Sequence, residues 1–415
     1  MHRHTFHFSL ALVILAAGWS LCAEAAPLTL GQAISLAVAH HPELAEAEAR
    51  VRVASALALE AGLYPNPALF ARMESAPLEH RTVDDAEFLV GVSQPIPLGG
   101  RLRAARKVEA LRARQRALER EARALEIARS VHETFVEALH WQEVAAVLRE
   151  AARIADRGVE SVEARVRSGD AVESELAQAR IERQRALLQL ERAESRGLDA
   201  HDALWTAMGQ PERAAESPVL ATAELPAEVP SLDAVVERAR GSALAEQYAA
   251  GVGAAEAGVE LARKEARPDL ELEAGLRHLG AEDEAAFDVG IALPIPLFDR
   301  NQGLIRAREA EVEATEAGRR AALVRLERDL RRAHRRMQLS MDQARRFREG
   351  ILEEAEETLR SIELRYQAGD VNLLAVLSAR RDWIDIQLDY LDAERDVMKA
   401  WASLSPFLME SRTMP

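Results

Sequence analysis

The chain has 415 residues, a formal net charge of −15 at pH 7, 48% hydrophobic residues and only 4% aromatic residues. Alanine, arginine and glutamate are prominent, a mixture typical of long helices that pack through small side chains. Because nucleic-acid binding requires clustered positive charge, the acidic balance argues against a nucleic-acid partner.

The first 25 residues have the pattern of a secretory signal peptide. A weakly basic start at 2–4 is followed by an apolar run at 8–19 and an A-x-A site at 23–25, which predicts cleavage before Ala26. A membrane anchor is the alternative, but this run is shorter than the ~20 residues of a spanning helix. The only cysteine, Cys22, lies in this segment. Lipid attachment there is disfavoured because Leu21 is not small, so the mature chain would carry no thiol.

In the first half of the mature chain, helices are predicted around one pair of strands. Thr29 and Gln32 form a capping-box pattern that opens a short helix, and Pro42 ends it. The elements expected next are a helix at about 43–63, strands at about 68–74 and 88–96, a proline-free helix at 101–167, a turn at 168–170, a helix at 171–207 and a linker at 208–230.

The second half repeats this plan. The expected elements are a short helix from Ser231 to Gly241, a helix at 242–266, strands at about 270–276 and 287–295, a helix at 300–367, a turn at 368–370, a helix at 371–404 and a tail at 406–415. Matching residues keep a nearly constant offset at Pro67/Pro268, Pro95/Pro294, Arg101/Arg300, Arg165/Arg365, Gly169/Gly369 and Asp170/Asp370. The sequence therefore predicts two structural repeats, 26–207 and 231–405, in one pseudo-symmetric molecule.

The long helices are expected to pack side by side. Each proline-free run would form a helix about 100 Å long at ~1.5 Å per residue. Leucines at seven-residue spacing (Leu111, Leu118, Leu125 and Leu139) are typical of a packed helical seam. In each half, the combined length of the two shorter helices nearly matches the length of the long helix. Each half is therefore predicted to form two columns of helix, one continuous and one broken. A soluble coiled coil would show the same periodicity, so that alternative stays open.

The four strands indicate an oligomer if they enter a membrane. Four strands cannot close a membrane barrel, whose smallest bacterial examples have about eight strands, and an open sheet edge is not tolerated in lipid. A trimer would supply twelve strands and twelve helical columns. Symmetry permits this trimer without requiring it.

The motifs at the repeat junctions and turns resemble those of a known family. Residues 293–303 read L-P-I-P-L-F-D-R-N-Q-G, and residues 366–371 read Y-Q-A-G-D-V with two leucines soon after. The chain resembles outer-membrane efflux proteins of the TolC type over almost all of its mature length. The first of these motifs is most similar to the cobalt–zinc–cadmium resistance (CzcC-like) branch. The first copy departs from it, with Gly99-Gly100 in place of Phe298-Asp299.

The resemblance implies a passive duct that is not an enzyme and needs no cofactor. It implies a homotrimer whose twelve-stranded β-barrel sits in the outer-membrane lipid of a Gram-negative bacterium, with a helical tunnel projecting into the periplasm. The partners implied are a periplasmic adaptor (membrane fusion) protein and an inner-membrane transporter of the resistance-nodulation-division class. Heavy-metal cations are the expected substrate, and organic toxicants or drugs are the alternative. A soluble periplasmic adaptor or scaffold is the competing class.

Two groups of candidate residues lie near the far turns. The docking candidates are Arg165, Gly169, Asp170, Arg365, Gly369 and Asp370. Their simpler role is structural, with the glycines as helix C-caps, Asp170 as an N-cap and the arginines placed near helix C-termini. The tunnel candidates are Glu173, Glu175, Asp382 and Asp385. Rings of such carboxylates would favour cation passage, and a solvated surface face is the alternative.

The third group marks the strand-to-helix junctions. It comprises Pro95, Pro97, Arg101, Pro294, Pro296, Asp299 and Arg300. A structural role is expected, in which the prolines fix the entry angle and Asp299 caps the following helix. The histidines lack the spacing of a metal site, and no nucleophile–base arrangement stands out, so neither a metal site nor a catalytic site is predicted.

Overall fold

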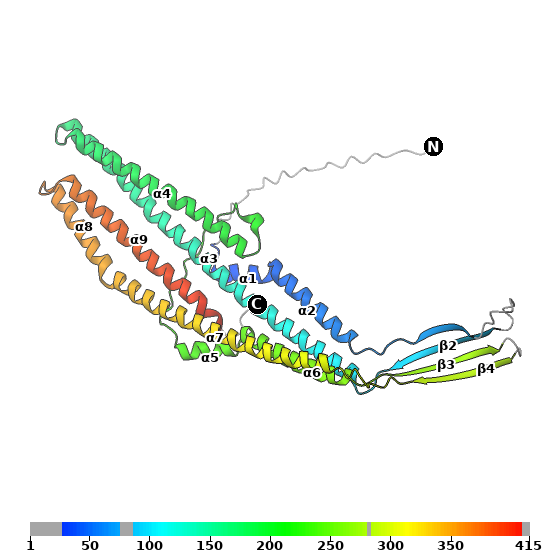
Figure 1. The fold of residues 1–415 in the computed structure, drawn as a ribbon. Helices are drawn as coiled ribbons and strands as arrows, with labels where there is room; N and C mark the ends of the chain where they lie inside the picture. The colour runs from blue at the N-terminus through cyan, green and yellow to red at the C-terminus, as the bar shows by residue number, and fades with distance from the viewer. Residues whose placement is uncertain (1–26, 75–85, 280–283, 409–415) are drawn as a thin grey trace, which may run out of the picture.

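The computed structural model describes residues 27–74, 86–279 and 284–408. The expected signal peptide, Cys22 and most of the C-terminal tail lie outside the described residues. The molecule is elongated, with a bundle of helices at one end and a small sheet at the other (Figure 1). The chain is mainly helical with a small antiparallel sheet, as the sequence predicts.

The elements follow the duplicated order. The first half contains α1 (Leu30–His40), α2 (Pro42–Glu60), β1 (Ala68–Glu74), β2 (Glu87–Ile96), α3 (Arg101–Ser168) and α4 (Glu173–Ala207). The second half contains α5 (Leu232–Arg240), α6 (Ala243–Glu265), β3 (Leu270–Leu279), β4 (Glu284–Ala292), α7 (Gln302–Arg346), α8 (Leu352–Gln367) and α9 (Leu373–Leu404). Short 3-10 turns lie at Pro211–Arg213 and Ser405–Phe407.

The second long helix differs from its prediction. The run expected as one helix over 300–367 begins at Gln302 and is interrupted by a π-helical turn, η3 (Phe347–Ile351), between α7 and α8. A π-turn inserts an extra residue without proline, so a proline-free run could not reveal it. The first long helix, by contrast, is continuous over 68 residues.

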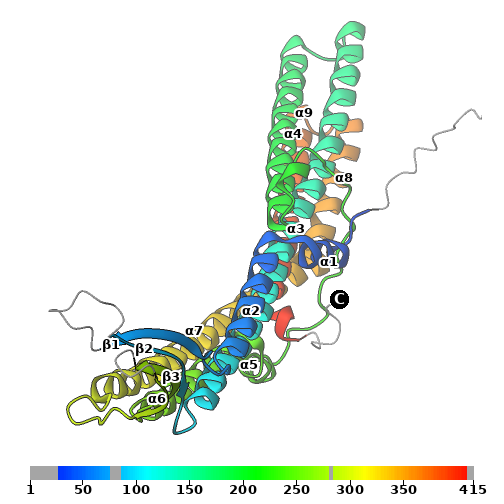
Figure 2. The same ribbon diagram turned by 90° about the vertical axis from the view of Figure 1, so that its right-hand side faces the viewer.

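Shorter helices lie along the long ones, as expected from their lengths. Both α2 and α4 pack on α3, and both α6 and α9 pack on α7. Helix α3 also contacts α6 and α9, so it joins the two halves. Figure 2 shows the two tip hairpins, α3/α4 and α8/α9, at the end of the molecule opposite the sheet.

A core cluster is centred on the middle of α3 and combines alanine with large apolar side chains. Phe135 and Leu139 pack there with Leu204, Trp205 and Met208 from α4 and its end. The predicted leucine seam is only partly correct. Leu139 is buried, whereas the leucines at 111, 118 and 125 are half-buried, and Ala104, Val108 and Ala122 fill the contacts in their place. These alanine side chains of α3 permit α2 and α6 to approach α3 closely in this region.

The sheet has strand order β1-β2-β3-β4, and all neighbours are antiparallel. The central pair, β2 and β3, joins the two repeats, and β1 and β4 are the edges. The predicted bounds of β1 are confirmed, whereas β3 is longer than expected and β4 is shifted by three residues toward the N-terminus. Among the described residues, no helix is long and apolar enough to cross a membrane.

Candidate functional site: helical tips, tunnel stripe and strand-to-helix junctions

Each tip hairpin turns at a glycine in the left-handed region. Gly169 and Gly369 both have φ 84°. The backbone N–H of Asp170 donates to Arg165 O at 2.8 Å, and that of Asp370 donates to Arg365 O at 2.9 Å. These bonds satisfy carbonyls that the helix ends leave open, so the capping role of both glycines is confirmed.

The predicted N-cap at Asp170 is wrong. Helix α4 begins at Glu173, and Val172 occupies its N-cap position. The Asp170 carboxylate instead accepts a hydrogen bond from Ser168 Oγ at 2.7 Å. In the second tip, Asn372 caps α9 by accepting from the backbone N–H of Ala375 at 3.1 Å.

The structure brings the two tips together through Arg165. The Arg165 guanidinium donates to the Tyr366 hydroxyl and, at 3.2 Å, to the Asp170 carbonyl oxygen. It also lies over the Tyr366 ring, 5.3 Å from its centroid, so a cation–π contact adds to the hydrogen bond. Sequence reasoning selected Arg165 but not Tyr366 as a candidate residue, although this tyrosine is the first residue of the 366–371 motif. Arg165 thus has a defined role that links the α3/α4 hairpin to the α8/α9 hairpin.

An acidic stripe runs along α9. Asp382 and Asp385 are exposed, and the stripe continues at alternating spacings of three and four through Asp389, Asp392 and Asp396. Burial raises the pKa of Asp385, and the nearby Asp389 and Asp382 carboxylates add to this effect. The sequence analysis missed the last three aspartates, although their spacing places all five on one helical face.

The other predicted acids lie elsewhere. Glu173 and Glu175 occupy the first turn of α4. Their negative charges interact favourably there with the positive end of the helix dipole. Within the described residues, no group of three or more histidine, cysteine, aspartate or glutamate side chains could hold a metal ion.

Buried histidines lie along the helical core. Burial lowers the pKa of His132 to about 4, and burial also lowers the pKa of His140 and of His201. His140 Nε2 lies 3.3 Å from Asp392 Oδ1, and Lys399 forms an ion pair with Glu137. These contacts attach α9 to the middle of α3.

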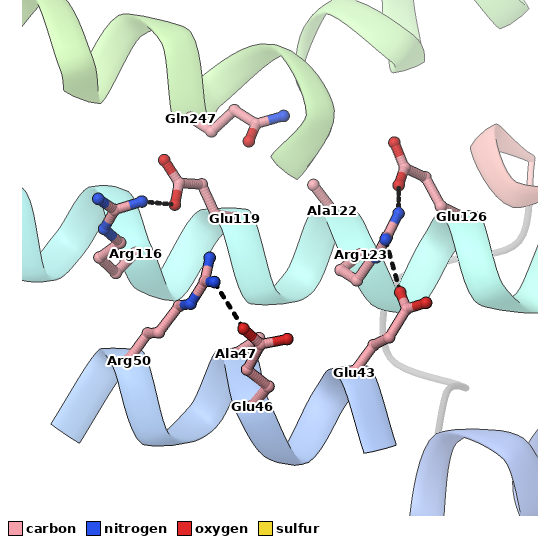
Figure 3. A pocket seen from close by; sticks show the side chains of 10 residues that line it. All are labelled: Glu43, Glu46, Ala47, Arg50, Arg116, Glu119, Ala122, Arg123, Glu126 and Gln247. Atoms are coloured by element: carbon pink, nitrogen blue, oxygen red, sulfur yellow. Dashed lines mark hydrogen bonds and ion pairs between the residues drawn. The ribbon is translucent and has the colours of Figure 1, made fainter. Parts of the chain in front are cut away.

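A charged hollow of about 460 Å³ lies among α2, α3 and α6 (Figure 3). Arg123 bridges Glu43 of α2 at 2.5 Å and Glu126 of its own helix at 2.7 Å. Arg50 and Arg116 pair within their own helices. The opposite charges that line this hollow form ion pairs with one another, and the Arg123–Glu43 pair links α3 to α2. The hollow presents no reactive group.

The first strand-to-helix junction is held by the second repeat. Arg101 opens α3 and forms an ion pair with Asp269 at 2.7 Å. Lys264 Nζ donates to the Gly99 carbonyl oxygen at 3.3 Å. Gly99 has φ 72°, a left-handed conformation that favours glycine, and a Cβ there would lie 2.5 Å from the Arg267 side chain, which would have to move.

The second junction is built differently. Asp299 was expected to cap the helix, but its carboxylate accepts from the backbone N–H of Asn301 at 2.9 Å, before the helix begins. Asn301 is the N-cap residue, with φ 59°, and its side-chain amide donates to Ala262 O at 2.8 Å. Arg300 therefore precedes α7, whereas its predicted match Arg101 begins α3. Both junctions contain the sequence P-I-P, so the sequence comparison did not reveal that α7 begins later than α3 relative to this motif.

The two faces of the sheet differ sharply in polarity. The strand registers place one set of alternating residues on a nearly continuous apolar face: Leu69, Ala71, Met73, Phe88, Val90, Val92, Leu272, Ala274, Leu276, Phe287, Val289 and Ile291. The opposite face carries Arg72, Glu74, Glu87, Glu271, Glu273, Arg277, Glu284 and Asp288.

Arg277 ties the four strands together on the charged face. Its guanidinium contacts Glu74 of β1 at 2.8 Å, Glu87 of β2 at 2.5 Å and Asp288 of β4 at 2.7 Å. Arg72 forms a further pair with Glu273 at 2.7 Å. The sequence analysis missed this network because its members are separated by up to 203 positions.

Comparison with known proteins gives a consistent result. The family described as outer membrane efflux protein matches residues 33–210 and 237–408. The cobalt-zinc-cadmium resistance protein CzcC of Cupriavidus metallidurans is 28% identical over 373 residues, which cover 88% of this chain and 86% of CzcC. The pyoverdine export outer membrane protein OpmQ of Pseudomonas putida is 28% identical over 418 residues, covering 91% of this chain and 87% of OpmQ. The crystal structure of the outer membrane protein VceC from Vibrio cholerae has a TM-score of 0.73 at 21% identity and covers 91% of this chain and 95% of that one.

Proposed function

We propose, since this chain belongs to the outer membrane efflux protein family, that it is the passive outer-membrane duct of a tripartite efflux system and exports heavy-metal cations. Members of this family are channels and not enzymes. The chain therefore provides a passage for the substrate and catalyses no reaction. Energy for export would come from an inner-membrane pump of the resistance-nodulation-division class.

The polarity of the sheet carries the proposal. One face is apolar and largely exposed, with Leu69 at 79%, Ile291 at 70% and Phe287 at 69%. A membrane strand alternates in this way when one side faces lipid and the other faces a polar lumen. Both sheet edges are free in the single chain, and lipid does not tolerate free edges. Three copies would pair β4 of one with β1 of the next and close a twelve-stranded barrel.

The tips are the proposed docking end. The α3/α4 and α8/α9 hairpins lie farthest from the sheet, so they would face the periplasm when the sheet is in the outer membrane (Figure 1). Their turns expose short loops at Gly169-Asp170 and Gly369-Asp370 on rigid helices. We assign to these loops, with Arg165 and Arg365, the contact with a periplasmic adaptor protein.

Metal cations are the proposed substrate because of two observations. CzcC, whose name states cobalt–zinc–cadmium resistance, is similar over most of both chains. Asp382, Asp385 and Asp389 of α9 would give a tunnel of three copies a negative lining, which raises the local concentration of cations, whereas Asp392 and Asp396 pair with Arg395. We assign Asp382 and Asp385 to this lining, with Glu173 and Glu175 near its entrance.

A deletion strain tests the substrate. Loss of the gene is expected to increase sensitivity to zinc, cobalt or cadmium salts, and the intact gene supplied in trans should restore tolerance. Unchanged metal tolerance together with new sensitivity to organic compounds would instead support the alternative substrate class. That alternative has its own observation, since OpmQ is named for export of pyoverdine, an organic molecule.

Membrane fractionation tests the location. The account predicts recovery of the chain in the outer-membrane fraction. Recovery only in the soluble periplasm would contradict the duct and support a periplasmic adaptor or scaffold.

A further inference from the structure

The two strand-to-helix junctions of the chain are not equally covered. In the first, β1 pairs with β2 only as far as Ala68 opposite Ser93. The last residues of β2, 94–96, pair with β3 alone, ending with Ile96 opposite Leu270. The end of β2 and the turn after it are therefore held by the other repeat, through strand pairing and the side chains of Lys264, Arg267 and Asp269.

The second junction has no such cover among the residues that the structure describes. β4 ends at Ala292, but the next residues continue the outward apolar alternation with Leu293, Ile295 and Leu297. These side chains are 50%, 75% and 63% exposed, and Phe298, which follows them, is 90% exposed. The apolar face of β4 therefore extends past its last paired residue, and the highly exposed Phe298 lies at the end of this extension.

A hollow of about 570 Å³ lies beside this uncovered run. Pro268, Pro296 and Phe298 are among the residues that line it, from the α6–β3 connection on one side and the second junction on the other. In the first junction, the corresponding region is occupied by side chains from the α6–β3 connection.

The repeat identifies the segment that would fill the hollow. The counterpart of the α6–β3 connection is the α2–β1 connection, because Pro67 corresponds to Pro268. Within one chain this connection lies on the far edge of the sheet, so only a second copy can bring it to the second junction. Its Leu63 and Tyr64 are 54% and 69% exposed, and Leu69 of β1 is 79% exposed.

The chemistry of the two sides also corresponds. Within the chain, the first junction offers glycines and Arg101, and the covering segment offers Lys264, Arg267 and Asp269. At the second junction Ile295 and Leu297 correspond to Ile96 and Leu98, Arg300 corresponds to Arg101, and Phe298-Asp299 replace Gly99-Gly100. The expected covering residues become apolar as well, with Leu63 and Tyr64. Gly99 contacts Lys264 and Arg267 at the first junction, and its counterpart Phe298 would meet Leu63 and Tyr64 at the second.

We propose that residues 293–298 of one copy form an apolar contact with residues 63–69 of the next copy, anchored by Phe298. The inference rests on the proposed trimeric duct and assigns a role to the longer turn between Pro296 and α7. The contact seals each boundary between copies where the sheet passes into the helices. The exposed run in the P-I-P-L-F motif is then the part of the chain that recognises another copy.

Cysteine cross-linking of the full-length protein in its membrane tests this contact. Leu69→Cys is combined in turn with Leu293→Cys, Ile295→Cys and Leu297→Cys, three positions on one face that cover a register shift of two residues. Cα atoms of antiparallel partners are about 4.5–5.5 Å apart, which a disulfide can span. Oxidation is expected to give covalent dimers and trimers that reduction reverses, from at least one pair. Each single-cysteine variant is the negative control. Ile96→Cys with Leu270→Cys is the positive control, because these partners lie in one chain and cross-link without raising its mass.

The anchor is tested by trimer stability. Phe298→Ala is expected to lower the temperature at which the purified trimer dissociates, and Phe298→Leu should retain most of the stability. The matched control Leu98→Ala changes the first junction and should leave dissociation unchanged, with helix content verified by circular dichroism for all three.

The outcomes separate the two levels of the proposal. A native mass of one chain in detergent would overturn the trimeric duct and this contact with it. A trimeric mass with no cross-link from any pair would overturn the contact alone and would place the run against lipid. A Phe298→Ala trimer as stable as the wild type would overturn the role of the anchor.

Discussion

Single residues determine how the long elements are joined. Arg165 links the two tips through Tyr366, and Arg277 links all four strands through three carboxylates. His132 is buried in α3, and its Nε2 has no hydrogen-bond partner among the described residues. None of these contacts follows from local sequence, because each depends on which distant segments the fold brings together. They are the places where one substitution should have a measurable effect.

His132 should make the stability of the protein depend on pH. Its pKa is about 4 in the folded chain and 6.5 in the unfolded chain, so the unfolded state binds more protons between these values. Stability is fully present above pH 6.5 and is lost as the pH falls toward 4, by up to about 3 kcal/mol at 1.36 kcal/mol per unit of pKa. Thermal unfolding in detergent at pH 7, 5.5 and 4 measures this loss.

The variant His132→Leu should reduce the slope of stability against pH, and the exposed His40→Leu should not. The remaining slope would reflect His140 and His201, whose pKa values are also lowered by burial. An unchanged slope in His132→Leu would contradict the assignment.

The Arg165 contact gives a second prediction at this scale. Arg165→Ala removes the hydrogen bonds to the Tyr366 hydroxyl and the Asp170 carbonyl oxygen, and a cation–π contact that is itself worth about 0.5–1 kcal/mol at an exposed site. Amide hydrogen exchange in residues 366–372 should therefore become about two- to five-fold faster, since 1.4 kcal/mol corresponds to a factor of ten. Tyr366→Phe keeps the ring and should have a smaller effect. Equal protection of the second tip in Arg165→Ala would show that the two hairpins are held by helix packing alone.

At the scale of elements, the helices and strands could be predicted closely because their signals are local. The missing prolines, the capping box at Thr29 and the repeated glycine turns locate most boundaries. Three features could not be predicted. The π-turn at 347–351 needs no sequence break, the start of α7 depends on the left-handed Asn301, and β4 ends at Ala292 although the apolar alternation continues beyond it. The tip candidates were identified correctly as turns, but the Arg165–Tyr366 contact requires the tertiary arrangement.

Glycine substitutions should distinguish the tip turns from helix interiors. Gly369→Ala places a side chain at φ 84°, where no neighbour lies within 4 Å of the new Cβ, so the expected cost of about 1–2 kcal/mol comes from the backbone alone. Gly318→Ala in α7 also has open space but ordinary helical geometry, and it should stabilise by about 0.5–1 kcal/mol. Opposite shifts in unfolding temperature are expected, and shifts of the same sign would contradict the left-handed turn.

At the scale of the whole molecule, the elongated shape places the small sheet and the paired hairpins at opposite ends. The amphipathic sheet at one end suits a membrane, and the paired hairpins at the other end suit a protein partner (Figures 1 and 2). Between them, α3 and the columns packed on it form a rigid spacer. Asp382, Asp385 and Asp389 form the part of the aspartate stripe of α9 that does not pair with Arg395. This arrangement explains why efflux function needs no catalytic residue in the chain.

The most direct test of the proposed duct is the metal content of cells that lack it. A deletion strain with its pump and adaptor intact is exposed to zinc, cobalt or cadmium at sublethal concentration, and cell-associated metal is measured by mass spectrometry. The account predicts that metal accumulates above the wild-type level and returns to it when the intact gene is supplied. Wild-type metal content in the deletion strain, together with increased retention of an organic compound, would contradict export of metal cations by this chain.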